Sequence, residues 1–151
     1  MKLKDVAVTF EHLSKLGFED YCELEQEVTR IREDLNGELA LNPSICSHFK
    51  TLMNTAKERL EKAELHFDIT CAKLKNEIHT ELGKTGTRAV KDLVESKLFM
   101  TGEYKLGRLQ VIKSDLIYCN LKGLLQALTK KQESLIQLSA NQREEVRLYS
   151  K

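Results

Sequence analysis

One segment that contains glycines and cations, Gly83-Lys84-Thr85-Gly86-Thr87-Arg88, has residue types suited to holding an anion. A Walker A loop needs a further glycine five residues before its second one, because bare backbone N–H groups wrap the phosphates. That position is Ile78, in an expected helix with no strand before it. The segment is therefore not expected to hold a nucleotide. It either contacts a nucleic-acid backbone or separates two helices.

Other catalytic and metal-binding patterns are not found. The four histidines are scattered along the chain, outside HExxH and Glu-x-x-His spacings. Glu64, His66 and Asp68 would point in different directions on a helix, so they would not converge on one ion. There is no nucleophile elbow, kinase signature or dinucleotide fingerprint. We therefore expect a binding protein rather than an enzyme, with no cofactor and no metal.

Cations gather around the glycine segment. Between residues 84 and 113, seven cations stand against three carboxylates. Glycines let exposed backbone N–H groups approach a phosphate, and cations on either side would strengthen the contact. The alternative is ordinary solvated lysines at the end of a helical hairpin. The candidate nucleic-acid contacts are Lys73, Lys75, Lys84, Arg88, Lys91, Lys105 and Arg108.

Three aromatic residues lie in or near this region. Phe99, Tyr104 and Tyr118 have rings on which unpaired bases could stack, each contact contributing roughly 1–3 kcal/mol. They could equally fill a hairpin core. We favour the core for Tyr118, and both roles stay open for Phe99 and Tyr104.

The net charge of +1 is unevenly distributed: residues 1–40 sum to −5, from five cations and ten carboxylates, and the remainder to +6. An acidic beginning on a mildly basic body suggests different partners for the two parts, or simply two solvated charge sets. Four widely spaced cysteines form no CxxC pair. They are expected to be reduced thiols in a cytoplasmic protein, without a signal peptide or membrane span.

The hydrophobic spacing predicts long helices. Apolar residues at helical steps run from Tyr21 to Leu39, and a second stripe runs from Ile45 to Leu82. Between them Gly37 weakens the first helix, and Asn42-Pro43 suggests a cap followed by a proline at the first helical position. The second stripe would make a helix of about 60 Å, which needs a partner along most of its length.

After the glycine segment, Thr87 is expected to cap a short helix over 88–97, and Gly102 to permit a bend. A further helix carries apolar residues from Tyr104 to Leu138, with heptad-like spacing from Ile117 onward. Gly107 and Gly123 in it suggest close helix approach. We therefore expect an all-α chain: an acidic N-terminal helical segment (1–40), then a long antiparallel hairpin (41–151) with a basic bend at 83–102.

Two such helices cannot bury apolar stripes on every side. Self-association into a homo-oligomer would cover what remains exposed. The alternative is a monomeric bundle in which the helix over 21–39 folds back onto the hairpin.

The stretch Lys91–Glu145 resembles the end of the UvsY-like phage recombination mediators. The resemblance consists of a short helix, a bend at Ser96-Lys97 and a long helix with a central Asp115. After these come a leucine-rich stretch, a basic pair, an Ile-x-Leu step and an Arg-Glu ending, which are Leu124–Leu128, Lys130-Lys131, Ile136 to Leu138 and Arg143-Glu144. Lys73-Leu74-Lys75 is the nearest counterpart of the family's Lys-x-Arg pair, whereas its adjacent tyrosines are missing. The resemblance implies a ring-shaped homo-oligomer that binds single-stranded DNA and helps load a recombinase, without catalysis or a cofactor.

Two functions follow. The first is a non-enzymatic, single-stranded-DNA-binding mediator of recombination or repair, whose acidic 1–40 segment meets a recombinase or a single-strand-binding protein, in the host cytoplasm if the protein comes from a phage. The second is a coiled-coil scaffold or adaptor that binds only protein. Without a membrane span, neither involves a membrane.

Overall fold

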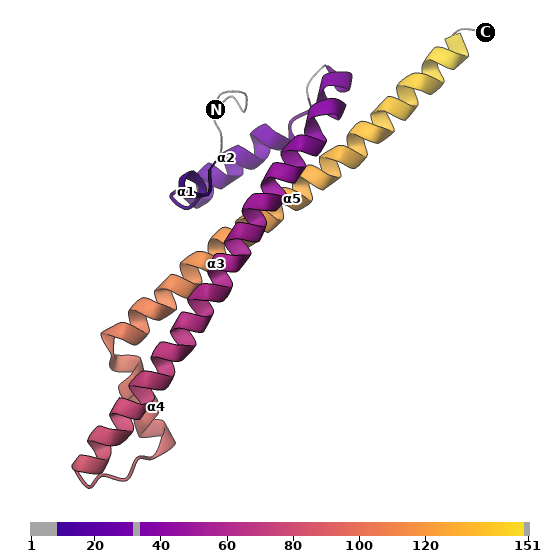
Figure 1. Cartoon of the computed structure of the whole chain (residues 1–151). Helices are drawn as coiled ribbons and strands as arrows, with labels where there is room; N and C mark the ends of the chain where they lie inside the picture. The colour runs from indigo at the N-terminus through magenta and orange to yellow at the C-terminus, as the bar shows by residue number, and fades with distance from the viewer. Residues whose placement is uncertain (1–8, 32–33, 150–151) are drawn as a thin grey trace. The chain divides into compact units, whose positions relative to one another are not determined.

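The computed structural model describes residues 9–31 and 34–149, and these residues form five helices and no strand. They are α1 (Phe10–Leu13), α2 (Phe18–Thr29), α3 (Leu35–Lys84), α4 (Lys91–Met100) and α5 (Gly102–Tyr149). The two long helices, α3 and α5, pack together (Figure 1). The expectation of an all-α chain is confirmed.

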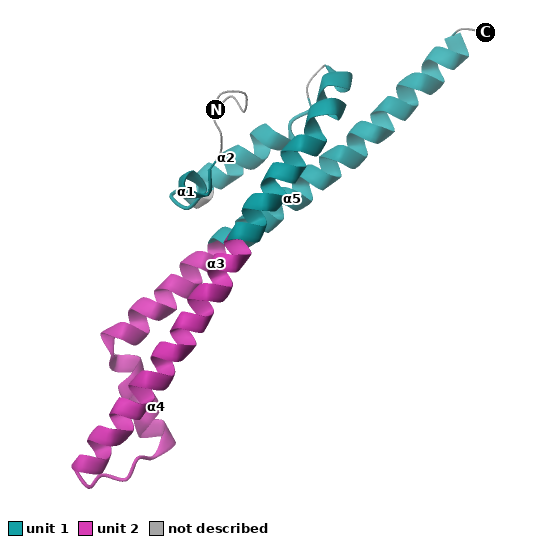
Figure 2. Cartoon of the chain, viewed as in Figure 1, with its two compact units in different colours: residues 1–55, 117–151 teal, residues 56–116 magenta. Residues whose placement is uncertain are grey.

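The chain divides into two compact units (Figure 2). Unit 1 contains residues 1–55 and 117–151, and unit 2 contains residues 56–116. Both long helices contribute to both units. This division follows packing, whereas the expected segments 1–40 and 41–151 follow charge and helix breakers.

The helix expected over residues 21–39 is wrong, because α2 ends at Thr29 and α3 begins at Leu35. Arg30 leaves helical geometry with a ψ of 126°. The new helix starts where the Asp34 carboxylate accepts a hydrogen bond from the N–H of Gly37 at 2.9 Å, as N-cap side chains do. The apolar spacing continues across this break, which is why the periodicity did not reveal it.

The helix start expected at Asn42-Pro43 is also wrong, since Pro43 lies inside α3. Asn42 is buried rather than capping, and its amide nitrogen donates to the Cys46 sulfur at 3.6 Å. A proline has no N–H to donate to the carbonyl four residues earlier, and in a helix interior it costs about 3 kcal/mol relative to alanine. Buried residues on both sides of it, Leu35 and Phe49, hold the helix in place.

The core of unit 1 is formed by α2, α3 and α5. Its buried apolar residues are Tyr21, Leu24 and Val28 on α2; Leu35, Phe49 and Leu52 on α3; and Leu121, Leu124, Leu128 and Leu135 on α5, and Leu13 of α1 is buried as well. Docking of α2 in this unit corresponds to the fold-back expected of the bundle alternative. The heptad-like spacing on α5 is confirmed from Leu121 to Leu135.

A buried lysine fills the seven-residue gap between Leu128 and Leu135. Lys131 forms an ion pair with Glu38 of α3, and these two side chains are only 5% and 10% exposed. Its ammonium group also donates to the carbonyl of Val28, at the end of α2, at 3.1 Å. One side chain therefore joins three helices, and a polar group at one position of an apolar seam fixes the register of the helices.

Replacing Lys131→Met should destabilise the protein by about 3 kcal/mol, because Glu38 then keeps an uncompensated charge in the core. The double variant Lys131→Met with Glu38→Leu should recover most of that loss, since no buried charge is left. Urea unfolding followed by circular dichroism measures both. A double variant as unstable as the single one would contradict this role for the pair.

Tyr21 predicts a loss of stability at high pH. Its hydroxyl donates to the Leu13 carbonyl at 3.0 Å, and burial raises the pKa of Tyr21 to about 12. Above the unfolded-state pKa of about 10, only the unfolded chain ionises freely, so stability should fall from there through pH 12, by roughly 3 kcal/mol at most. In Tyr21→Phe the decline measured by urea unfolding should be shallower. An equally steep decline in both proteins would exclude Tyr21 as its source.

Candidate nucleic-acid interface

The glycine segment ends α3 through a helix-terminating motif. The helix stops at Lys84, and Gly86 follows with a positive φ of 67°. The N–H of Thr87 donates to the carbonyl of Leu82 at 3.0 Å, and the N–H of Gly86 donates to that of Gly83 at 3.3 Å. These two bonds around a left-handed glycine form a Schellman motif. Gly86 is thus required by the backbone conformation.

This motif corrects the expectation of exposed backbone N–H groups for a phosphate. The N–H of Thr85 also donates within the chain, to the carbonyl of Glu81 at 3.2 Å. The hydroxyl of Thr85 donates to the carbonyl of Leu82 at 3.0 Å. The N–H groups of residues 85–87 are therefore already used, so an anion beside these three residues would be held by side chains.

The helix expected over residues 88–97 begins three residues later, as α4 at Lys91. Thr87 does not cap it, because its side chain contacts Thr85 (Oγ1–Oγ1 distance 3.1 Å) and Val90 occupies the cap position. The bend expected at Gly102 is confirmed: Thr101 separates α4 from α5, with its hydroxyl donating to the carbonyl of Leu98 at 2.7 Å.

Unit 2 is built around a small apolar core. Leu74, Ile78 and Leu82 of α3 pack with Val94 and Leu98 of α4, and Tyr104 of α5 packs against them. The Tyr104 ring lies 5.2 Å from that of Phe67 and 5.1 Å from that of Phe99, centroid to centroid. This core holds α4 against the end of α3 and so positions the cations of the connection.

Of the two glycines expected to mark close helix approach, one does so. A Cβ at Gly107 would lie 2.8 Å from the Phe67 ring, so α5 meets α3 closely there. At Gly123 the expectation is wrong, because nothing lies within 4 Å of the corresponding position.

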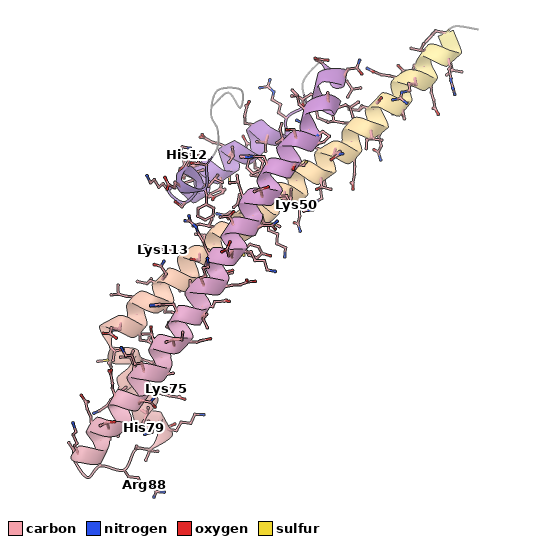
Figure 3. All side chains as sticks on the ribbon, viewed as in Figure 1. His12, Lys50, Lys75, His79, Arg88 and Lys113 are labelled. Atoms are coloured by element: carbon pink, nitrogen blue, oxygen red, sulfur yellow. The ribbon has the colours of Figure 1, made fainter. Side chains whose placement is uncertain are left out.

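All seven candidate cations lie in unit 2, and all are exposed. Lys73, Lys75 and Lys84 are on α3, Arg88 is in the connection, Lys91 begins α4, and Lys105 and Arg108 are in the first turns of α5. Figure 3 shows Arg88 beyond the end of α3, and Lys75 on the same helix as His79. Lys73 and Lys75 lie on different faces of α3, since two residues span just over half a turn.

One of these cations is partly neutralised. Lys91 lies 3.9 Å from the Glu95 carboxylate, one turn along α4. Within residues 9–31 and 34–149, the other six have no ion-pair partner. Lys84 and Arg88, at the α3–α4 connection, are therefore the best placed for an external anion.

The aromatic residues separate into two roles. Tyr104 is half-buried between Phe67 and Phe99, so it belongs to the packing of unit 2. Tyr118 is also half-buried, in unit 1. Phe99 is 50% exposed and has one side of its ring supported by Tyr104. Phe99 is thus the ring with a surface left for stacking.

Within the described residues, the side chains that could bind a metal do not form a cluster, and the Cys71 thiol is not activated. No group of three or more His, Cys, Asp or Glu side chains gathers there as metal ligands would. The four cysteines are free thiols. Burial raises the pKa of the Cys71 thiol, against the lowering influence of Lys75, which disfavours a reactive thiolate. No helix in this part of the chain has the length and apolar content to span a bilayer.

Sequence reasoning did not identify the exposed apolar surface of unit 2. Leu106, Leu109, Ile112 and Leu116 belong to the expected stripe of α5, yet each is at least half exposed. The face that meets α3 carries Tyr104, Gly107 and Val111 instead. The small residue Gly107 was the signal that could have indicated this face.

The Schellman motif predicts opposite effects for the two glycines. Gly86→Ala should destabilise the protein by roughly 1–2 kcal/mol, because a Cβ strains a left-handed residue even where space is open. Gly83→Ala, the matched control inside α3, should be neutral or stabilising by up to about 1 kcal/mol. Thermal unfolding by circular dichroism compares them. Equal shifts in both variants would contradict the motif.

Comparison with protein-family models, with curated protein sequences and with solved structures finds no match. The resemblance of residues 91–145 to the UvsY-like mediators therefore remains an expectation from sequence.

Proposed function

We propose that this chain is a non-enzymatic, homo-oligomeric helical protein that binds single-stranded DNA through the α3–α4 end of unit 2 and assists recombination or repair. The observation that carries the proposal is the set of exposed cations without ion-pair partners at that end, above all Lys84 and Arg88. Cations not already neutralised are the groups that release counterions on meeting a phosphate backbone.

The position of Phe99 favours a single strand over a duplex. It is on α4, the helix that starts with Lys91, and its half-exposed ring rests on Tyr104. A supported ring can stack an unpaired base, whereas bases in a duplex already stack on one another. Cations for the backbone and a ring for a base are the two components that single-strand-binding surfaces combine.

A single copy has few cations for tight binding, so the proposal includes self-association. A long antiparallel hairpin of α3 and α5 would present one basic end per copy, and a ring would gather several such ends. Each further neutralised phosphate adds to the affinity. The exposed leucines of α5 in unit 2 support this association, because apolar patches of this kind mark interaction surfaces.

The partner protein in this proposal is a recombinase or a single-strand-binding protein, as the resemblance to the UvsY-like mediators implies. The acidic side chains of α2 support a separate contact for it. Glu19, Asp20, Glu23 and Glu25 are exposed on that helix, so it would contact a basic surface rather than DNA.

The test is binding of a fluorescent oligonucleotide, measured by polarisation at several salt concentrations. Affinity should fall as salt rises, and the triple variant Lys84→Glu, Arg88→Glu, Lys91→Glu should weaken binding at least about tenfold. The slope of log affinity against log salt should shrink by about 0.7 for each phosphate that the variant no longer neutralises. Reversal of Lys122 and Lys130, exposed cations of unit 1, is the control and should change affinity far less.

The alternative is a helical scaffold or adaptor that binds only protein. The exposed apolar side chains of unit 2 favour it, since they need a protein surface and not a nucleic acid. If no oligonucleotide binds at low salt while the protein still assembles, the scaffold function replaces the proposal. If binding occurs but the triple variant retains it in full, the α3–α4 end is not the DNA site.

A further inference from the structure

Unit 2 carries apolar side chains on two opposite faces. Phe67 of α3 touches Gly107 of α5, so these two residues define the inner faces of the two helices and a common height. Leu109, Ile112 and Leu116 follow Gly107 by two, five and nine residues, which places each about half a turn away from the inner face. They are 52%, 50% and 58% exposed, and Leu106 beside them is more exposed still. These four residues are called the α5 stripe.

The opposite face has a smaller apolar patch at the same height. Leu65 and Ile69 lie two residues before and after Phe67, so both point away from α5. They are 62% and 60% exposed. These two residues are called the α3 pair. Each copy of unit 2 thus presents two different apolar surfaces, one on each side.

The charges nearest the two surfaces differ in sign, although Lys73, one turn after Ile69, adds a cation beside the α3 pair. Lys105 and Arg108 flank Leu106 on α5, whereas Glu64 and Asp68 lie beside Leu65 and Ile69 on α3. In the part of the chain that the structure describes, none of these four has an ion-pair partner. Within unit 2, α3 and α5 run in opposite directions (Figure 1). Arg108 and Asp68, which directly follow Gly107 and Phe67, therefore lie on the same side of the helix pair.

We propose that copies of this chain associate head to tail through unit 2, with the α5 stripe of one copy packed on the α3 pair of the next. Side-by-side copies bring Lys105 and Arg108 of one beside Glu64 and Asp68 of its neighbour. A two-fold contact between α5 stripes would instead oppose cations, and one between α3 pairs would oppose carboxylates. Head-to-tail contacts generate rings or open filaments.

The proposal deepens the self-association in the proposed function, and it gives Lys105 and Arg108 a role at the interface between copies instead of at DNA. The seven candidate cations then divide by position. Those at the α3–α4 end stay available to a strand, and those in the first turns of α5 bind a neighbouring copy.

A charge-swap experiment on the full chain tests this, with mass from light scattering on a size-exclusion column and helicity from circular dichroism. The acidic-stripe variant is Lys105→Glu with Arg108→Glu, and the basic-pair variant is Glu64→Lys with Asp68→Lys. Each alone should fall to a smaller species while staying helical, since like charges then meet at the interface. An equimolar mixture should regain the large species, because each variant now complements the other on both faces.

Several outcomes overturn the proposal. The proposal is wrong if the wild-type protein is a monomer, or if either variant still assembles. It is also wrong if both variants are helical but their mixture does not regain the large species. Loss of assembly in the acidic-stripe variant alone would show that the α3 pair is not part of the interface between copies. The control is Lys84→Glu with Arg88→Glu, which should assemble normally. Because assembly is measured without DNA, failure to bind an oligonucleotide leaves this result independent of the DNA-binding proposal.

Discussion

The apolar contact between α3 and α5 is the constraint on which the rest of the structure depends. Helices of 50 and 48 residues cannot be stable in water unless a partner covers one face of each along their length. In unit 1 that face is the leucine seam of α5, and in unit 2 it is the contact of Phe67 with Tyr104 and Gly107. Shorter helices then pack against the two long ones: α2 in unit 1 and α4 in unit 2.

Polar groups then decide details that apolar burial leaves free. Lys131 joins α2, α3 and α5 through Glu38 and the carbonyl of Val28, which a leucine at the same position would not do. Such a pair contributes little net stability compared with apolar side chains, but it disfavours other registers. At the end of α3, two backbone hydrogen bonds around Gly86 stop the helix and turn the chain toward α4. Lys84 and Arg88 lie at this connection, where the N–H groups of residues 85–87 are already bonded.

The surface of unit 2 connects structure to function. Its exposed cations suit a polyanion, and its two exposed apolar faces suit other copies of the chain, so one small unit would serve both contacts. The division proposed for the cations follows from geometry, since Lys84 and Arg88 lie at the α3–α4 connection whereas Lys105 and Arg108 lie beside the α5 stripe. Multiple copies would supply the positive charge that a single copy lacks.

The sequence by itself determined the helical class, the uninterrupted helix up to Lys84 and the bend before Gly102. It also determined the exposed position of all seven candidate cations. These features follow from periodicity and from the scarcity of glycine and proline, which act locally. It failed at residues 30–43, where the apolar spacing crosses a break and Pro43 is held inside a helix by packing. Only the tertiary structure decided which face of α5 is inner, that Lys131 is buried, and that Phe99 stays open while Tyr104 is covered. Those outcomes depend on contacts between residues far apart in the chain, to which a local pattern is insensitive.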